Sequence, residues 1–164
     1  MKRDLVSVLD IKDEFKEIID LAITMKGEHK DGMDIALCVI DLDEMEVQFS
    51  GAFNPLYLIR NDELIEVRGD KMPIGIAYMT ETSFTNHKIS VLSGDQIYLF
   101  SDGFADQFGG PDEKKFRYGQ FKELLLSINK QKMEKQRMLL DKKFNQWMGD
   151  VEQVDDVLVI GMKI

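Results

Sequence analysis

The sequence has few of the residues that build disulfide, histidine-based or membrane-spanning structures. Of its 164 residues, one is cysteine and two are histidine. The single thiol, Cys38, lies in an apolar run; it allows no internal disulfide and fits a reducing compartment, the cytoplasm. His29 and His87 lie far apart among polar neighbours, which argues against a histidine metal site or a Ser-His-Asp triad. No apolar segment approaches the roughly 20 residues that span a bilayer, and the N-terminus has no signal-peptide core.

Positive charge is also in short supply. The chain has 21 Lys and Arg against 30 Asp and Glu, a formal net charge of −9. Such a surface repels phosphates, which argues against nucleic-acid and anionic-membrane partners. The composition of 44% hydrophobic and 31% charged residues is typical of a soluble globular protein. The length predicts one domain, over residues 1–164.

What the sequence does contain is a short apolar run with acidic residues at its exit. The run Ile97–Phe100 is bounded by Gly and Asp on both sides, which is typical of a strand buried on both faces. This strand delivers Ser101, Asp102 and Gly103 to its end, and Asp106 follows within a turn. An acidic residue placed by a buried strand indicates a rigidly held oxygen ligand or an acid/base group. Alternatively, Asp102 caps the turn or helix that follows.

The remaining pattern predicts mostly strands early in the chain and helices later. The predicted strands are Met33–Asp41, Glu46–Gly51, Leu56–Arg60, Leu64–Val67, Thr82–Val91 and a buried strand Val157–Ile164. Three helices are predicted. The first is Ile11–Lys26, with Asp10 as its N-cap; the second has its apolar face at Phe121, Leu124, Leu125 and Ile128, and the third at Leu140, Phe144, Trp147 and Met148. We expect Lys130–Lys135 to be the solvated junction between the last two helices. Strands and helices segregate without βαβ alternation, so the fold class is α+β with mainly antiparallel sheets.

A second acidic pair, Asp155-Asp156, precedes the last predicted strand. If that strand is the antiparallel neighbour of Ile97–Phe100, Asp102 and Asp155 meet at one end of the sheet. Two carboxylates about 4 Å apart repel by roughly 4 kcal/mol at an effective dielectric near 20. Either one of them is protonated or a cation lies between them. Oxygen ligands alone select magnesium or manganese over zinc. The alternative is that both are solvated acids at strand ends.

Five motifs along the chain together resemble a known family. They are DGMDIAL (Asp31–Leu37), GAFNPLYLI (Gly51–Ile59), PIGI (Pro73–Ile76), GDQIYLFSDGFADQFGG (Gly94–Gly110) and QVDDVLVIG (Gln153–Gly161). In this order they resemble the SpoIIE-like branch of the PPM-type metal-dependent protein serine/threonine phosphatases. The resemblance implies a β-sandwich flanked by helices and a centre of two magnesium or manganese ions. It also implies that the protein hydrolyses phosphoserine or phosphothreonine on a regulatory protein in bacterial-type signalling. In such proteins a sensor or repeat module often precedes the phosphatase domain.

The resemblance also implies roles for individual residues. Asp102 matches the aspartate of the family's DG turn, and Asp155 the first aspartate of its DD motif; both are metal ligands in the family. Asp156 matches the second, more variable position of that motif, and Gly103 lets the backbone turn beneath the metal, so both have supporting roles. Asn54, with the proline after it, matches a structural turn near the site.

The sequence departs from the family pattern in three places. Phe53 stands where the family usually has His, and Leu158 where a Thr is common. Nothing before Asp31 matches the strands that carry the family's metal-bridging Asp-Gly, and Met1–Lys26 matches only the helix after them. The sequence therefore resembles the C-terminal part of such a domain.

Three expectations follow from the missing strands: weak metal binding, negligible activity of this fragment alone, and self-association as a homodimer or edge-paired oligomer. A non-catalytic interaction module is the alternative function. A carboxylate-pair sugar hydrolase would explain Asp102 and Asp155 but none of the other motifs.

Overall fold

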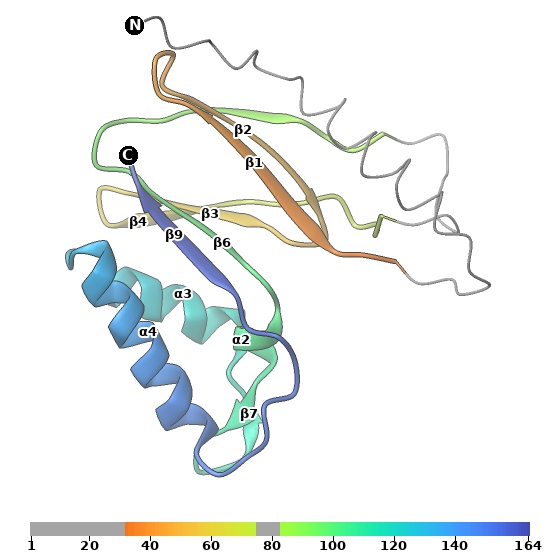
Figure 1. Cartoon of the computed structure of the whole chain (residues 1–164), viewed down its shortest axis with the longest axis vertical. Helices are drawn as coiled ribbons and strands as arrows, with labels where there is room; N and C mark the ends of the chain where they lie inside the picture. The colour runs from red at the N-terminus through yellow and green to blue at the C-terminus, as the bar shows by residue number, and fades with distance from the viewer. Residues whose placement is uncertain (1–31, 75–82) are drawn as a thin grey trace, which may run out of the picture. The chain divides into compact units, whose positions relative to one another are not determined.

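The computed structural model describes residues 32–74 and 83–164 (Figure 1). The chain divides into two compact units, Met1–Phe53 with Gly69–Ser90 and Asn54–Arg68 with Val91–Ile164. Each unit is treated by itself below. The predicted helix Ile11–Lys26 and the second half of the PIGI motif, Gly75-Ile76, lie outside the described residues.

The first unit contains a three-stranded antiparallel sheet in the order β1-β2-β5. Its strands are β1 (Ile35–Asp41), β2 (Glu46–Ala52) and β5 (His87–Ser90). The predicted strands Met33–Asp41 and Glu46–Gly51 correspond to β1 and β2, which form an antiparallel hairpin with Ile35 opposite Ala52 and Asp41 opposite Glu46. The Asp41 carboxylate holds the turn by accepting hydrogen bonds from the N–H groups of Asp43 and Glu44, at 3.0 and 2.9 Å. Strand β5 is shorter than the predicted Thr82–Val91.

The second unit contains a four-stranded sheet in the order β4-β3-β6-β9, in which all neighbours are antiparallel. Its strands are β3 (Leu56–Arg60), β4 (Glu63–Val67), β6 (Gln96–Phe100) and β9 (Val159–Lys163). The two-residue turn between β3 and β4 puts Asn61 and Asp62 in the left-handed region, at φ 51° and 65°. Asn and Asp tolerate this conformation, and such turns match the twist of a hairpin. Antiparallel pairing in both sheets confirms the predicted α+β class.

The prediction that Val157–Ile164 forms a buried strand is wrong in one respect. Strand β9 has a neighbour on one side only, β6, so among the described residues it forms the edge of its sheet. Its residues are half-buried or exposed, and Ile160 is 43% exposed. Apolar β-branched composition predicts a strand, but it does not distinguish an edge position from a central one. By contrast, β6 lies between β3 and β9 and is almost fully buried, as predicted.

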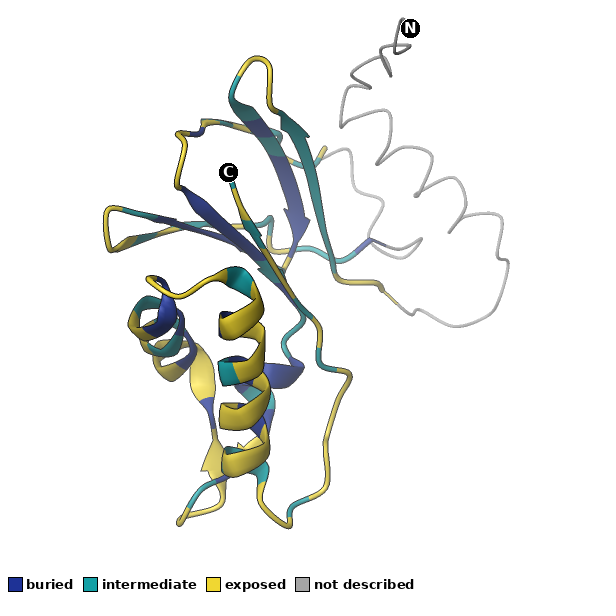
Figure 2. Cartoon of the chain, turned by 60° about the vertical axis from the view of Figure 1, so that its left-hand side comes forward, coloured by how far each residue is buried: buried dark blue, intermediate teal, exposed yellow. Residues whose placement is uncertain are grey.

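Helices lie on one side of this second sheet (Figure 1). They are α2 (Gly103–Asp106), α3 (Arg117–Ile128) and α4 (Met133–Met148), and a short hairpin of β7 (Phe108–Gly109) and β8 (Lys114–Lys115) lies between α2 and α3. Helix α4 already begins at Met133, so the predicted junction Lys130–Lys135 is too long. Met133 packs against the core, while Glu134 and Lys135 lie on the exposed face of the first turn. Figure 2 shows the outward face of α4 as exposed.

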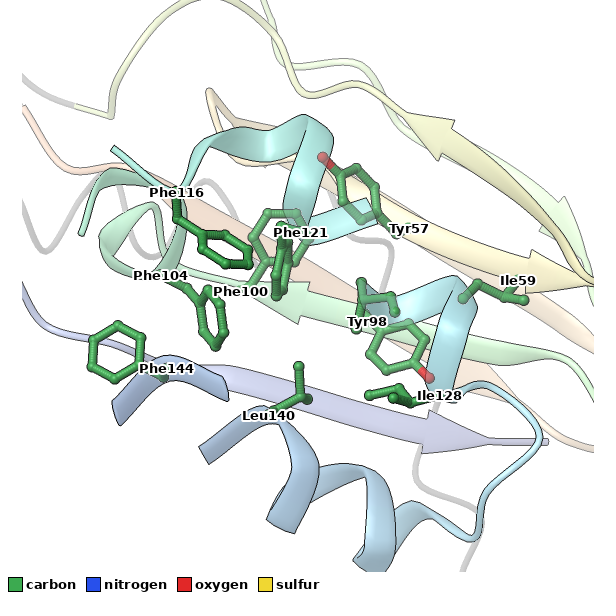
Figure 3. Packing of buried hydrophobic residues seen from close by; sticks show 11 residues of the cluster. Tyr57, Ile59, Tyr98, Phe100, Phe104, Phe116, Phe121, Ile128, Leu140 and Phe144 are labelled. Atoms are coloured by element: carbon green, nitrogen blue, oxygen red, sulfur yellow. The ribbon is translucent and has the colours of Figure 1, made fainter. Parts of the chain in front are cut away.

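The core of the second unit lies between its sheet and these helices (Figure 3). Phe121, on α3, is fully buried at its centre. The Phe121 ring lies 5.0 Å from that of Phe100 and 4.8 Å from that of Phe104. The buried members of this cluster are Tyr57, Ile59, Tyr98, Phe100, Phe104, Phe116, Phe121, Leu125, Ile128, Leu140 and Phe144. No helix of the described residues is long and apolar enough to cross a membrane.

Candidate functional site

The pairing of β6 with β9 builds the candidate site. Phe100 at the end of β6 lies opposite Val159 at the start of β9. The pairing continues one residue further, since the Ser101 N–H donates to the Leu158 carbonyl at 3.0 Å. The exit of β6 and the entry to β9 therefore lie at the same end of the sheet, as Figure 1 shows beside α2. The sequence analysis required that the strands next to Asp102 and Asp155 be antiparallel neighbours, and β6 and β9 meet this requirement.

Gly103 lets these two segments approach closely. A Cβ atom at Gly103 would lie 2.4 Å from the carbonyl oxygen of Asp156 and 3.2 Å from Cγ2 of Val157. Gly103 is not among the residues with positive φ in the described chain. Its lack of a side chain therefore serves close contact between backbones and not a left-handed turn.

Asp102 stands at the N-cap position of α2, but its side chain makes no capping hydrogen bond. The alternative interpretation of Asp102 as a helix cap is therefore not supported. Two other acids near β6 are paired with cations. Asp106 contacts Lys115 at 2.8 Å, and Asp95, at the other end of β6, contacts Arg60 at 2.6 Å. Asp102 forms no such ion pair with the residues that the structure describes.

The acidic pair before β9 is exposed to solvent. One carboxylate oxygen of Asp155 accepts a hydrogen bond from the Asp156 N–H at 2.8 Å. The Gln153 side chain donates to the main-chain oxygen of Asp155 at 2.7 Å. The backbone of Asp156 is engaged as well, because its carbonyl accepts from the Ser101 hydroxyl at 2.7 Å. The segment is thus held mainly through hydrogen bonds to its main chain.

The oxygen donors present suit a hard cation only in part. Carboxylates on two neighbouring segments match the ligand chemistry of Mg²⁺ or Mn²⁺. However, within residues 32–74 and 83–164 no group of three or more His, Cys, Asp or Glu side chains is arranged to hold a metal ion. Asp102 and Asp155 thus lie on neighbouring segments, and no third acidic, histidine or cysteine side chain of the described residues completes a metal site with them.

Asn54 lies at the same end of the second sheet. Tyr57 of β3 pairs with Tyr98 of β6 in an antiparallel register, so the start of β3 lies beside the end of β6. Asn54, two residues before β3, is half-buried there. Phe53, which stands where a His is usual in the resembled motif, has a positive φ of 59° and is 48% exposed.

Sequence reasoning placed Ser101 at the end of the buried strand without giving it a role, and it did not single out Gln107. The Ser101 hydroxyl and the Gln107 amide both hydrogen-bond to the backbone of the segment before β9. Gln107 is fully buried. The weak signal for it was its position, a polar residue two places before the Gly109-Gly110 pair.

A groove of about 830 Å³ lies on the helix side of β9. Phe104, Leu140 and Phe144 contribute apolar side chains to it, and Glu134 and Arg137 of α4 contribute charged ones. Gln153 and Val157, which flank the acidic pair, also line it.

The fold defines the class of this protein, because known structures of one class superpose on it. The SiaA-PP2C domain of Pseudomonas aeruginosa matches with a TM-score of 0.85 at 24% identity, over 93% of this chain and 60% of that one. The PP2C phosphatase domain of SpoIIE from Bacillus subtilis, solved with a fragment of its regulatory domain, matches with a TM-score of 0.73 at 20% identity, over 98% and 46%. RsbX in complex with magnesium matches with a TM-score of 0.64 at 11% identity, over 95% and 65%. The chain has the fold of the PPM-type phosphatases.

The family follows from the sequence. Residues 9–164 match the family model of stage II sporulation protein E, so the chain belongs to the SpoIIE family, as the five motifs indicated. None of the curated proteins matches the chain. The chain spans 60% and 46% of the lengths of the SiaA and SpoIIE structures.

Proposed function

We propose that this chain is a PPM-type phosphatase domain that removes phosphate from phosphoserine or phosphothreonine of a regulatory protein. The observation that carries the proposal is the β6–β9 pairing, which places the Asp102 and Asp155 segments side by side in a chain of the SpoIIE family. The proposed site uses the predicted residues. Asp102 and Asp155 hold Mg²⁺ or Mn²⁺, and Asp156 and Gly103 support them. When bound, the ions supply an activated water for attack on phosphorus.

The chain's own residues prepare this site. Gly103 admits the backbone of Asp156, and the Asp155 carboxylate is oriented by the hydrogen bond from the next N–H. Two carboxylates leave most of the coordination sphere of Mg²⁺ to water, so metal binding by residues 1–164 alone is weak. Turnover of aryl phosphates by this chain alone is negligible for the same reason, because the reaction requires two ions at a fixed spacing.

Calorimetric titration with manganese tests the site. We expect weak binding to the wild-type chain and a further loss of at least about tenfold in Asp102→Asn and Asp155→Asn. Asp106→Asn is the matched control, because Asp106 lies in the same segment and already pairs with Lys115. Binding that is unchanged by Asp102→Asn and Asp155→Asn, or weakened as much by Asp106→Asn, contradicts the assignment.

The proposed partners are a phosphoprotein substrate, a sensor or repeat module of the same protein, and a second copy of the chain, with the cytoplasm as the compartment. The net charge of −9 opposes nucleic-acid binding. A homodimer is supported by β9, which is an edge strand among the described residues. It carries the exposed Ile160, and the exposed Leu158 directly precedes it; open apolar edges favour pairing. Light scattering that shows a stable monomer at high concentration contradicts the dimer.

A non-catalytic interaction module is the second candidate, and the groove along β9 favours it. Apolar side chains such as Leu140 and Phe144 line it together with the charged Glu134 and Arg137, a mixture that suits contact with a partner protein. The two candidates differ in one measurement. The measurement uses the chain joined to the metal-bridging Asp-Gly segment that the family places before it, since the chain alone is expected to turn over negligibly. Manganese-dependent hydrolysis of a phosphoprotein by that protein, abolished in Asp102→Asn, supports the phosphatase. Binding of the same phosphoprotein without phosphate release, retained in Asp102→Asn, supports the module.

A further inference from the structure

The segment that carries Asp155 is held at two points by side chains from the segment that carries Asp102. Ser101, directly before Asp102, makes the first contact. Its hydroxyl donates to the Asp156 carbonyl at 2.7 Å and accepts from the Leu158 N–H at 2.9 Å. Both bonds lie on the C-terminal side of Asp155.

Gln107 makes the second contact, on the N-terminal side of Asp155. Its amide nitrogen donates to the Glu152 carbonyl at 2.9 Å, and its amide oxygen accepts from the Val154 N–H at 3.3 Å. The same nitrogen donates to the Phe108 carbonyl at 3.0 Å. The side chain is fully buried, so an unsatisfied amide there would be costly, and this favours one orientation.

The backbone of Gln107 is fixed as well. Its carbonyl accepts from the Trp147 indole at 3.1 Å and from the Phe116 N–H at 2.9 Å, and its own N–H donates to the Gly103 carbonyl at 3.1 Å. The amide therefore projects from a rigid position. A rigid support of this kind is what a ligand on an exposed segment requires.

We infer that Ser101 and Gln107 are positioning residues, which fix the Asp155 carboxylate relative to Asp102 by clamping the backbone on both sides of Asp155. The inference deepens the proposed metal site and rests on it for its functional meaning. The clamp has a readout of its own, however, because the N–H groups of Leu158 and Val154 are bonded to these side chains.

The test compares Ser101→Ala and Gln107→Met with the wild-type chain by amide hydrogen exchange and by Mn²⁺-induced line broadening in NMR spectra. We expect exchange at Leu158 to accelerate about tenfold in Ser101→Ala, and exchange at Val154 by a similar factor in Gln107→Met. In each variant the Mn²⁺ concentration that half-broadens the Asp102 and Asp155 signals rises about tenfold. Ser101→Thr keeps a hydroxyl and restores both readouts.

Two variants serve as matched controls. Ser127→Ala removes a hydroxyl that donates to a backbone carbonyl of α3, that of Leu124 at 2.7 Å. Gln136→Met removes another buried amide, which bonds the carbonyl of Gln131 at 2.9 Å and the side chain of Gln96 at 2.8 Å. Gln136→Met lowers the melting temperature as Gln107→Met does, but it leaves exchange at Val154 and the Mn²⁺ midpoint unchanged.

The outcomes separate the clamp from the proposed function. If the wild-type signals do not broaden with Mn²⁺, the metal site is wrong, and the exchange rates alone decide whether the clamp exists. Faster exchange without a change in the Mn²⁺ midpoint overturns the positioning role, as does an equal change of the midpoint in Gln136→Met. Unchanged exchange at Leu158 in Ser101→Ala overturns the clamp even where Gln107→Met fails to fold.

Discussion

Replacing Gly103 by alanine should destabilise the second unit through a single backbone contact. The new Cβ would lie 2.4 Å from the Asp156 carbonyl oxygen and 3.0 Å from its carbon. An ordinary contact begins near 3.4 Å, so one of two hydrogen-bonded segments must move by about 1 Å. Both contact atoms belong to the main chain, which cannot turn aside as a flexible side chain can. Moving this main chain also strains the hydrogen bonds between Ser101 and the segment before β9.

The magnitude follows from two opposing effects. Forcing extra volume into a packed contact costs about 1–3 kcal/mol. Alanine in place of a helical glycine returns about 0.5–1 kcal/mol, since Gly103 begins α2. We expect a net loss of about 1–2 kcal/mol in the free energy of unfolding, which for a chain of this length lowers the melting temperature by about 3–6 °C.

Urea unfolding followed by the fluorescence of the single tryptophan, Trp147, measures this loss. Gly119→Ala is the matched control, because Gly119 also lies in a helix and a Cβ there would meet no atom within 4 Å. That substitution should stabilise the chain by about 0.5–1 kcal/mol. If Gly103→Ala stabilises the chain as Gly119→Ala does, the close contact between the two segments is wrong.

Three further predictions concern stability and reactivity. Phe121→Ala should cost about 3–5 kcal/mol in urea unfolding, because Phe121 is fully buried, whereas a cost below about 1 kcal/mol would contradict the packing of the core. Burial opposes the charge of Asp95, but the hydrogen bonds and charge of Arg60 lower the Asp95 pKa below its usual 3.8. The ion pair therefore stabilises the fold above about pH 4, and this stabilisation is lost as the pH falls further. The difference in unfolding free energy between wild type and Asp95→Asn should shrink on acidification, and a difference that stays constant contradicts this. Burial raises the pKa of Cys38 from 9.0 to about 11. Its alkylation at pH 8 should therefore be about 100-fold slower than that of a free thiol, and labelling at the free-thiol rate contradicts this burial.

Much of the site region could be predicted from local chemistry. A β-favouring run between Gly-Asp and Asp-Gly pairs predicts the central strand, and β6 is that strand. Acids at the exit of one strand and the entry of another predict that the two meet if the strands pair in antiparallel fashion, and β6 and β9 do so. These inferences use residues that are near one another in the sequence, where periodicity and turn chemistry carry information.

The rest depends on partners that are distant in the sequence. Whether Val157–Ile164 is buried depends on how many strands flank it, and its composition says nothing about that number. The start of α4 at Met133 depends on the contact of that side chain with the core. Gln107 is polar, and nothing in its local sequence predicts that it is buried; two of the backbone groups that its amide bonds, in Glu152 and Val154, lie more than 40 residues away.

The hydrogen bond from Ser101 to Asp156 joins residues that are 55 positions apart in the chain. At a synthesis rate of about 5–20 residues per second, the ribosome needs several seconds to extend the chain from one to the other. During that interval a nascent chain carries Asp102 without Asp155, and α3 and α4 can form before the second carboxylate exists. In the proposed site, metal binding by both carboxylates therefore has to await synthesis of the segment that precedes β9.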